Sequence, residues 1–441
     1  MSTVEGLIAE LREVCADLPD RRTGPSRDDA YTMTDIGLSA FSIFFMGSPS
    51  FLAHQRALEE GHSRSNCQTL FGMTAIPTDN DIRRMLDGAA PAMFDRLFMK
   101  AIEAAGPLTP FQCLGGRVLI ALDGTEHFCS RKIKCRQCST RLRADGGTEY
   151  FHAFLGASMV APGHKRVLPL PPEFIAPQDG AVKQDCERNA AKRWLARQGA
   201  TLAYLRPVYL GDDLFACQPI VAAIQEAGGS FILTCKPSSH PTIAEYLHGA
   251  ELQEHRQIVC KRGTRTTTIY RWLDAVPLRG TDDAISVNWF SIETLNAKGK
   301  RTYYNSFVTS SFGNAGVPPT KRETDLIVTV DTVAELAVCG RARWKIENEI
   351  FNVLKTNGYN LEHNFGHGKE TLASVMVTLN LLAFAFHTAA YLAVVAWRAA
   401  VVARGPTYRF FEHLRTITAY VVFRDWAHLL QSIGAAAIRP P

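Results

Sequence analysis

The sequence lacks the features that mark several large classes of protein. It has no internal repeat and no low-complexity tract, and its 46% apolar and 21% charged residues exclude a disordered, collagen-like or coiled-coil chain. It shows no basic segment followed by an apolar run near its start, so we expect no secretory signal. The net charge of only +5 excludes a uniformly basic, histone-like surface but leaves room for local basic patches.

The cysteines point to the compartment. All eleven are spread along the 441-residue chain, and without a secretory signal this distribution favours reduced thiols and a cytoplasmic protein.

One uncharged apolar segment, residues 376–397, is long enough to cross a bilayer. It contains Asn380 and His387, side chains that hydrocarbon tolerates poorly, so we interpret it as a buried core helix and expect no membrane contact.

The hydrophobic pattern predicts a mixed α/β chain with helical ends. Residues 78–87 read as a helix capped by Thr78, with Arg83 and Arg84 on its polar side. From residue 237 to about 323 the pattern alternates, which is typical of antiparallel strands, and the chain is helical again from 332 to about 404. Between the helical start and the alternating region we expect strands at 117–123, 150–160, 166–170, 206–213 and 230–236, and helices at 185–197 and 215–227.

Three acidic residues occupy positions where α/β proteins place reactive side chains. Asp123 and Asp212 each close a predicted core strand, and Glu347 lies in a predicted helix. Carboxylate oxygens bind hard divalent cations, and two such cations about 4 Å apart clamp the attacking and leaving oxygens of a phosphodiester displacement. If the three carboxylates converge, they predict a site for two hard divalent cations.

The segments around these acids resemble the DDE transposases of bacterial insertion sequences. The run Arg343-Trp344-Lys345-Ile346-Glu347 is similar to the glutamate signature of the cut-and-paste group, which carries a β-rich insertion before the glutamate. Residues 122–126 (LDGTE) resemble the strand of the first aspartate, and residues 209–213 (YLGDD) resemble that of the second. The resemblance covers residues 75 to 390, and the alternating region falls where the family has its insertion.

The resemblance implies a ribonuclease-H-like mixed sheet flanked by helices and interrupted by an antiparallel β insertion. It implies five segments: a helical DNA-binding region at 1–115, the first part of the catalytic core at 116–236, the β-rich insertion at 237–325, the glutamate helix at 326–370 and a helical C-terminal region at 371–441.

The implied activity is that of a metal-dependent nuclease and strand transferase. Such an enzyme binds terminal inverted repeats, hydrolyses a phosphodiester bond at each element end, passes through a hairpin at that end, and joins the 3′-OH to target DNA. Its expected partners are double-stranded DNA and a second copy of the chain, in the nucleoid. A catalytically inactive, domesticated transposase that only binds DNA is the alternative.

The resemblance assigns Asp123, Asp212 and Glu347 to Mg²⁺, and Arg343 and Lys355 to phosphate. Arg343 lies one helical turn before Glu347, so the two share a face. The family usually has Tyr where Gly340 stands, and Lys seven residues after the glutamate, whereas Lys355 comes eight after it. Two rivals remain, Asp213 for Asp212 and Glu349 for Glu347; we favour Asp212, which follows the predicted strand more directly, and the phasing from Arg343 favours Glu347.

A Cys-x-x-Cys motif at Cys135 and Cys138 supplies half of a tetrahedral zinc site. Cys129, His127 or His152 could complete a structural Zn²⁺ site; reduced, idle cysteines are the alternative. Farther along the chain, His363, Asn364 and His367 lie in a glycine-containing loop, where they either line the catalytic site or simply accompany a helix-terminating turn.

Basic residues gather in two stretches of the sequence that we expect to contact the DNA backbone. Ordinary solvated strand faces are the alternative, especially for the second stretch. The first stretch comprises Arg131, Lys132, Lys134, Arg136, Arg141 and Arg143, and the second includes Arg256, Lys261, Arg262, Arg265 and Arg271.

Overall fold

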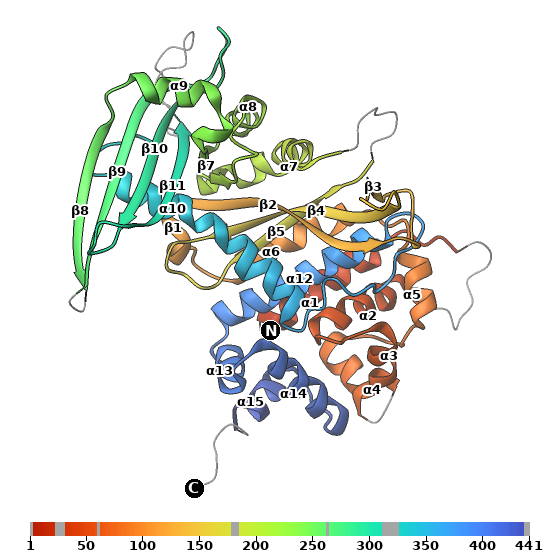
Figure 1. The fold of residues 1–441 in the computed structure, drawn as a ribbon. Helices are drawn as coiled ribbons and strands as arrows, with labels where there is room; N and C mark the ends of the chain where they lie inside the picture. Colours follow the sequence, from red (N-terminus) through yellow and green to blue (C-terminus); the bar gives the residue numbers. More distant parts are fainter. Residues whose placement is uncertain are drawn as a thin grey trace.

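The expected mixed α/β architecture is present. The computed structural model describes residues 3–22, 31–59, 62–177, 185–261, 264–310 and 326–435. Within these ranges an 11-stranded mixed sheet runs through the molecule, and helices pack on its faces (Figure 1). The buried apolar side chains of sheet and helices form one contiguous core.

The sheet has the strand order β3-β4-β2-β6-β7-β11-β10-β9-β8, with β5 paired to β4 and β1 paired to β2. Strands β5, β4 and β2 are antiparallel, whereas β2, β6 and β7 are parallel. The strands are β1 (Gln112–Cys113), β2 (Arg117–Ser130), β3 (Ser139–Leu142), β4 (Thr148–Val160), β5 (Leu168–Ile175), β6 (Val208–Gly211), β7 (Ser230–Thr234), β8 (Gln253–Lys261), β9 (Thr264–Pro277), β10 (Ser286–Leu295) and β11 (Arg301–Ser310).

Strand β2 is longer than its apolar run predicts. The run ends at Asp123, but β2 continues to Ser130 because residues 124–130 still pair with β4. Only the first half of β2 is covered on both edges, since its last recorded pair with β6 joins Ala121 to Leu210. Asp123 therefore lies inside a strand, just beyond the point where the recorded parallel pairing with β6 stops.

Helices cover both faces of the core strands. On one face lie α7 (Glu187–Leu202) and α8 (Gln218–Glu226), and on the other lie α6 (Asp95–Ala104) and α12 (Leu372–Ala393) (Figure 1). Parallel strands covered on both faces are expected to be buried along their whole length, as β6 and β7 are.

The remaining helices belong to the two ends of the chain, to the glutamate segment and, in the case of α9, to the alternating region. Thr78 caps α5 as expected, because its hydroxyl accepts a hydrogen bond from the Asp81 backbone N–H. These helices are α1 (Thr3–Ala16), α2 (Met33–Phe45), α3 (Phe51–Glu59), α4 (Ser63–Asn66), α5 (Asp79–Leu86), α9 (Pro241–Gly249), α10 (Val333–Arg341), α11 (Asn352–Thr356), α13 (Val395–Arg404), α14 (Thr407–Tyr420) and α15 (Trp426–Ala435).

Helix α12 contains most of the long apolar segment 376–397, whose last residues belong to α13 after a break at Val394. It is long and apolar enough to cross a membrane, but its most apolar window is entirely buried inside the fold. It packs against α1, α2, α6 and β5, so the N-terminal and C-terminal helices share one core around it. Its polar residues have partners there: Asn380 donates to the Tyr359 carbonyl at 2.8 Å, and His387 Nδ1 lies 2.7 Å from the Tyr359 hydroxyl.

The alternating region is β-rich but not a separate sheet. Strand β11 pairs with β7, so the strands predicted as an insertion continue the core sheet (Figure 1). The region opens with a helix, α9, where the sequence pattern predicts strands; Pro241 stands at its first position, which suits a helix start. The predicted end of the insertion, residue 325, lies outside the described residues.

Candidate active site

The parallel register of β2 and β6 places the two aspartates at the same level. Ala121 on β2 lies opposite Leu210 on β6. Asp123 and Asp212 each come two residues later, one on each segment. β6 ends at Gly211, which leaves the edge of β2 uncovered at this point. The two carboxylates are close enough for Asp212 to raise the pKa of Asp123.

Glu347 reaches the aspartates from a long helical stretch that starts with α10. After α10 the backbone continues through a 3₁₀ turn, η6 (Ala342–Trp344), a π turn, η7 (Glu347–Phe351), and α11. Arg343 Nη1 lies 3.1 Å from Asp123 Oδ2 and 2.8 Å from Glu347 Oε1, so one guanidinium bridges the strand and the helix. The expected sharing of a helix face by Arg343 and Glu347 is confirmed.

The electrostatics of this cluster are those of crowded carboxylates. The pKa of Asp123 is raised to about 7, chiefly by burial; Arg343 opposes the rise, and the negative charges of Glu347 and Asp212 add to it. The Asp123 side chain is 14% exposed and that of Glu347 is 48% exposed, so the cluster opens to solvent on the glutamate side. Such a set can hold a hard cation, whose charge offsets the repulsion.

A fourth carboxylate, Glu187, was not singled out by the sequence analysis. It is the first residue of α7, and a Cβ added to Gly124 would overlap its carboxylate, so its side chain lies directly against β2 at Gly124. Burial raises the pKa of Glu187, and Asp212 raises it further. A glycine next to Asp123 in a strand was the available signal, since such a glycine often marks a close approach.

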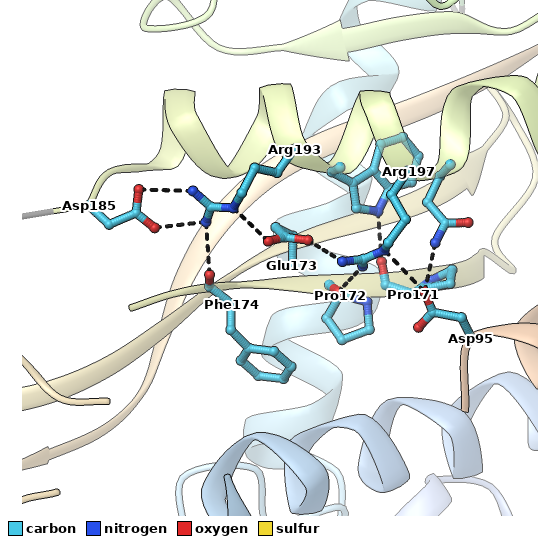
Figure 2. Close-up of polar contacts among 10 residues, drawn as sticks. Asp95, Pro171, Pro172, Glu173, Phe174, Asp185, Arg193 and Arg197 are labelled. Atoms are coloured by element: carbon cyan, nitrogen blue, oxygen red, sulfur yellow. Dashed lines mark hydrogen bonds and ion pairs between the residues drawn. The ribbon is translucent and has the colours of Figure 1, made fainter. Parts of the chain in front are cut away.

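Helix α7 is held in place by an ion-pair network (Figure 2). Arg193 lies 2.8 Å from Glu173 on β5 and 2.7 Å from Asp185, and Arg197 pairs with the same glutamate. The carboxylates are largely buried, at 10% exposure for Glu173 and 1% for Asp185, so each depends on its arginine partner. The network fixes the start of α7 and with it the position of Glu187.

The geometry favours Asp212 and Glu347 over their rivals. Asp213 Oδ1 accepts a hydrogen bond from the Lys236 backbone N–H at 2.6 Å and lies 3.2 Å from His240 Nε2, so this carboxylate is used to hold the start of the next loop. Glu349 lines a different pocket of about 470 Å³ together with His164 and Tyr359. Neither rival is among the groups that shift the pKa of Asp123.

The two departures from the transposase signature have local structural explanations. A Cβ at Gly340 would lie 2.8 Å from the Phe307 ring and 2.9 Å from Ile232, so α10 can pack on β7 and β11 only with glycine here. On a regular α-helix, Lys355 would be rotated about 80° from Glu347. The π turn at residues 347–351 contains one residue more per turn than an α-helix, and this turns Lys355 back towards the helix face that carries Glu347. The Nζ of Lys355 lies 2.9 Å from Glu362.

A second glycine sets the distance between the glutamate helix and the sheet. Gly156 on β4 pairs with Asp123, and a Cβ there would lie 2.8 Å from the ring of Phe351 in η7. We expect Gly156→Ala to destabilise the fold by about 1–3 kcal/mol through overpacking. Because Phe351 belongs to the same turn as Glu347, the substitution should also displace the glutamate and lower cleavage. Chemical unfolding and a cleavage assay test this, with Gly147→Ala, in an exposed turn, as the control.

Two histidines, one of them from a segment far along the chain, lie next to the Cys-x-x-Cys motif. Cys135, Cys138, His152 and His367 place their ligand atoms within 4.8 Å of one another. Of the three completing residues that the sequence left open, His152 is in this group and Cys129 is not; the Cys129 Sγ lies 3.7 Å from Arg141. His127 is not in it either; its ring stacks on His152.

The first basic stretch is only partly available to DNA. Arg141 and Arg143 pair with Glu149 at 2.6 and 2.7 Å, because the β3–β4 hairpin places Arg141 opposite this glutamate. Arg131 lies 3.3 Å from Asp145. Within the described part of the chain, three further basic side chains of this stretch are exposed and form no ion pair: Lys132, Lys134 and Arg136.

The second basic stretch is described less fully. Arg256 on β8 and Arg271 on β9 both pair with Glu254 on β8, as solvated strand residues often do. Arg265 is exposed on β9. Arg262 and the side chain of Lys261 lie outside the described residues.

The geometry thus brings Asp123, Asp212 and Glu347 together with Arg343 and adds Glu187, while the cysteine motif forms a separate cluster. Compared with models of known protein families and with curated proteins, the chain matches none, so its function has to be inferred from these residues.

Proposed function

We propose that the chain is a DDE transposase of the cut-and-paste type, with a ribonuclease-H-like catalytic core. One observation carries the proposal: three carboxylates that together span more than two hundred residues of the sequence lie close to one another, and two of them pair with one arginine. The resemblance picks out the same four residues from sequence alone. The parallel β2–β6 pair next to antiparallel β4 and β5 supports the core fold.

The site fits the divalent cations that this reaction uses. Its donors are carboxylate oxygens, which Mg²⁺ and Mn²⁺ prefer. The pKa of Asp123 is raised mainly by burial and in part by the neighbouring carboxylates, and a bound cation would favour the ionised form of all three. Asp123, Asp212 and Glu347 would hold two such ions, with Glu187 next to them. When bound, the ions would activate water and offset charge on the phosphate.

Arg343 is the residue of the site best suited to hold the scissile phosphate. Its guanidinium is already directed at the carboxylate cluster, between Asp123 and Glu347. Arginine binds phosphate through two parallel hydrogen bonds, which fixes orientation as well as charge. When cations take over the neutralisation of the carboxylates, the guanidinium is free to turn to the DNA.

The proposed reaction starts with hydrolysis of one strand at the element end: water adds to the phosphorus, the P–O3′ bond breaks, and the products are a 3′-OH and a 5′-phosphate. The 3′-OH then attacks the opposite strand, displaces the 3′-oxygen of the flanking DNA and closes a hairpin, which a second water molecule opens again. The regenerated 3′-OH finally attacks a phosphorus of target DNA and displaces the 3′-oxygen of the target strand. Because an element has two ends, we expect a homodimer on DNA.

DNA-backbone contact is proposed for the exposed basic turn that precedes β3. Replacing Lys132, Lys134 and Arg136 with alanine should weaken binding of unrelated and end-specific DNA by similar factors, since such residues contact phosphates and do not read bases. If all three side chains bind phosphate, the slope of log K against log salt concentration should become shallower by about 0.9 per contact, or about 2.7 in total. Fluorescence anisotropy at several salt concentrations measures this. Arg143→Ala is the paired-residue control, and an unchanged affinity would contradict the assignment.

An inactive DNA-binding relative of such enzymes is the second candidate. This candidate predicts DNA binding without cleavage. The presence of all three expected carboxylates, Asp123, Asp212 and Glu347, favours an enzyme. The test uses labelled duplexes copied from the DNA on either side of the gene, with Mg²⁺, Mn²⁺ or chelator. Metal-dependent nicking at a fixed position, followed by joining to a supercoiled plasmid, supports the transposase. Binding without nicking in either metal supports the alternative.

A further inference from the structure

The four residues of the cysteine cluster come from three separate parts of the fold. Cys135 and Cys138 lie in the turn between β2 and β3, His152 is on β4, and His367 follows the glutamate helix. Cys138, His152 and His367 are buried, and Cys135 is partly buried. Two thiols and two imidazoles thus face one another in the interior, where polar groups need partners.

The spacing of the ligand atoms is that of a tetrahedral metal site. Zinc binds sulfur at about 2.3 Å and nitrogen at about 2.0 Å, so a tetrahedron around it has sulfur–sulfur and sulfur–nitrogen edges of about 3.8 and 3.5 Å. The two Sγ atoms are 3.9 Å apart. His152 Nε2 lies 3.4 Å from each of them, and His367 Nε2 lies 3.4 Å from Cys138 Sγ.

A disulfide does not explain the arrangement, because a bonded pair of sulfurs would be about 2.05 Å apart. Nor does a catalytic role, since catalytic zinc sites keep one position open for water whereas this set supplies four protein ligands. We propose that Cys135, Cys138, His152 and His367 bind one structural Zn²⁺ ion. This inference is independent of the proposed DNA chemistry.

The ion would tie the glutamate segment to the sheet. His367 lies 229 residues after Cys138, and it follows α11, the helix that continues from the turn carrying Glu347. A metal at this point therefore fastens the chain after the glutamate helix to β4, whose Gly156 already packs against that helix. Zinc binding at such a site contributes directly to folding stability, because the unfolded chain has no preformed site.

The experiment measures metal content and stability of the full chain, purified with zinc and without chelator. We expect about one zinc ion per chain by elemental analysis, lost in Cys138→Ser and in His367→Asn. The matched controls are Cys129→Ser, an exposed thiol outside the cluster, and His363→Asn, an exposed histidine in the same loop as His367; both should keep the metal. Chelator should lower the unfolding temperature of the wild type and the controls.

A second measurement covers variants that fail to fold. Stripped wild-type protein is titrated with Co²⁺, which gives strong visible absorption and a sulfur charge-transfer band in a tetrahedral site with two thiolates; Zn²⁺ should displace it at one equivalent. Zinc-free protein after purification with added zinc, together with no tetrahedral Co²⁺ spectrum, overturns the proposal. Retention of zinc by His367→Asn at unchanged affinity overturns the assignment of the fourth ligand.

Discussion

Glu347→Gln should lower the rate of DNA cleavage by about a thousandfold or more, equivalent to about 4 kcal/mol of transition-state stabilisation. The amide keeps the size and hydrogen bonding of the side chain but removes the charge that holds a divalent cation. Asp123→Asn and Asp212→Asn should have the same effect. DNA affinity should hardly change, because carboxylates do not attract phosphate.

Matched controls separate metal binding from a general loss of negative charge. Glu349→Gln removes a carboxylate two residues away that lines another pocket, and it should retain cleavage. Asp213→Asn should also retain it, since Asp213 serves the Lys236 N–H and His240. The measurement is single-turnover cleavage of a labelled duplex, alongside binding of the same duplex. Cleavage that survives in Glu347→Gln would remove the carboxylate model of the site, and loss only in Asp213→Asn would move the second aspartate by one residue.

Arg343→Ala should lower single-turnover cleavage by about a hundredfold, roughly the cost of removing one well-placed donor to a reacting oxyanion. The structure gives the reason: this guanidinium already lies between Asp123 and Glu347, where the phosphate would meet the carboxylates. Arg343→Lys should recover part of the rate, because it keeps the charge and loses the two-pronged hydrogen bonding.

The control for Arg343 is its neighbour Arg341. That side chain lies over the Tyr303 ring at 4.2 Å, away from the carboxylates, so Arg341→Ala should leave the rate of cleavage within a few-fold of the wild type. Equal losses in both variants would indicate a general electrostatic effect on DNA binding. Unchanged cleavage in Arg343→Ala would exclude the arginine from the chemistry.

Part of the candidate site could be read from local sequence. The apolar runs ending at Asp123 and before Asp212 predict neighbouring strands, and the helical spacing of Arg343 and Glu347 predicts a shared face. Local residue types and the absence of charge were also sufficient for the Thr78 cap and for a buried apolar helix, although that helix ends at Ala393, inside the predicted segment 376–397. Each of these depends on contacts within a few residues or on the polarity of one segment, which the sequence displays directly.

Other features needed the tertiary structure. Strand β2 extends beyond Asp123 only because β4 pairs with it, and Glu187 reaches the cluster only because α7 begins beside Gly124. Arg141 and Arg143 are engaged by Glu149, a pairing set by the register of a hairpin. In each case the deciding partner lies on another element, and its register cannot be deduced from the pattern of a single segment.

The sequence by itself determined the order of the elements, the polarity of their faces and the chemical types available: three acids at the right places, a Cys-x-x-Cys pair and a basic turn. The tertiary structure decided which of them meet. His367 joins Cys135 and Cys138 across 229 residues, in place of the nearby Cys129. The reason is physical: ligand sets and carboxylate clusters are fixed by distances in space, and chain folding brings remote residues to within a few ångströms while it directs sequence neighbours to opposite faces of a strand.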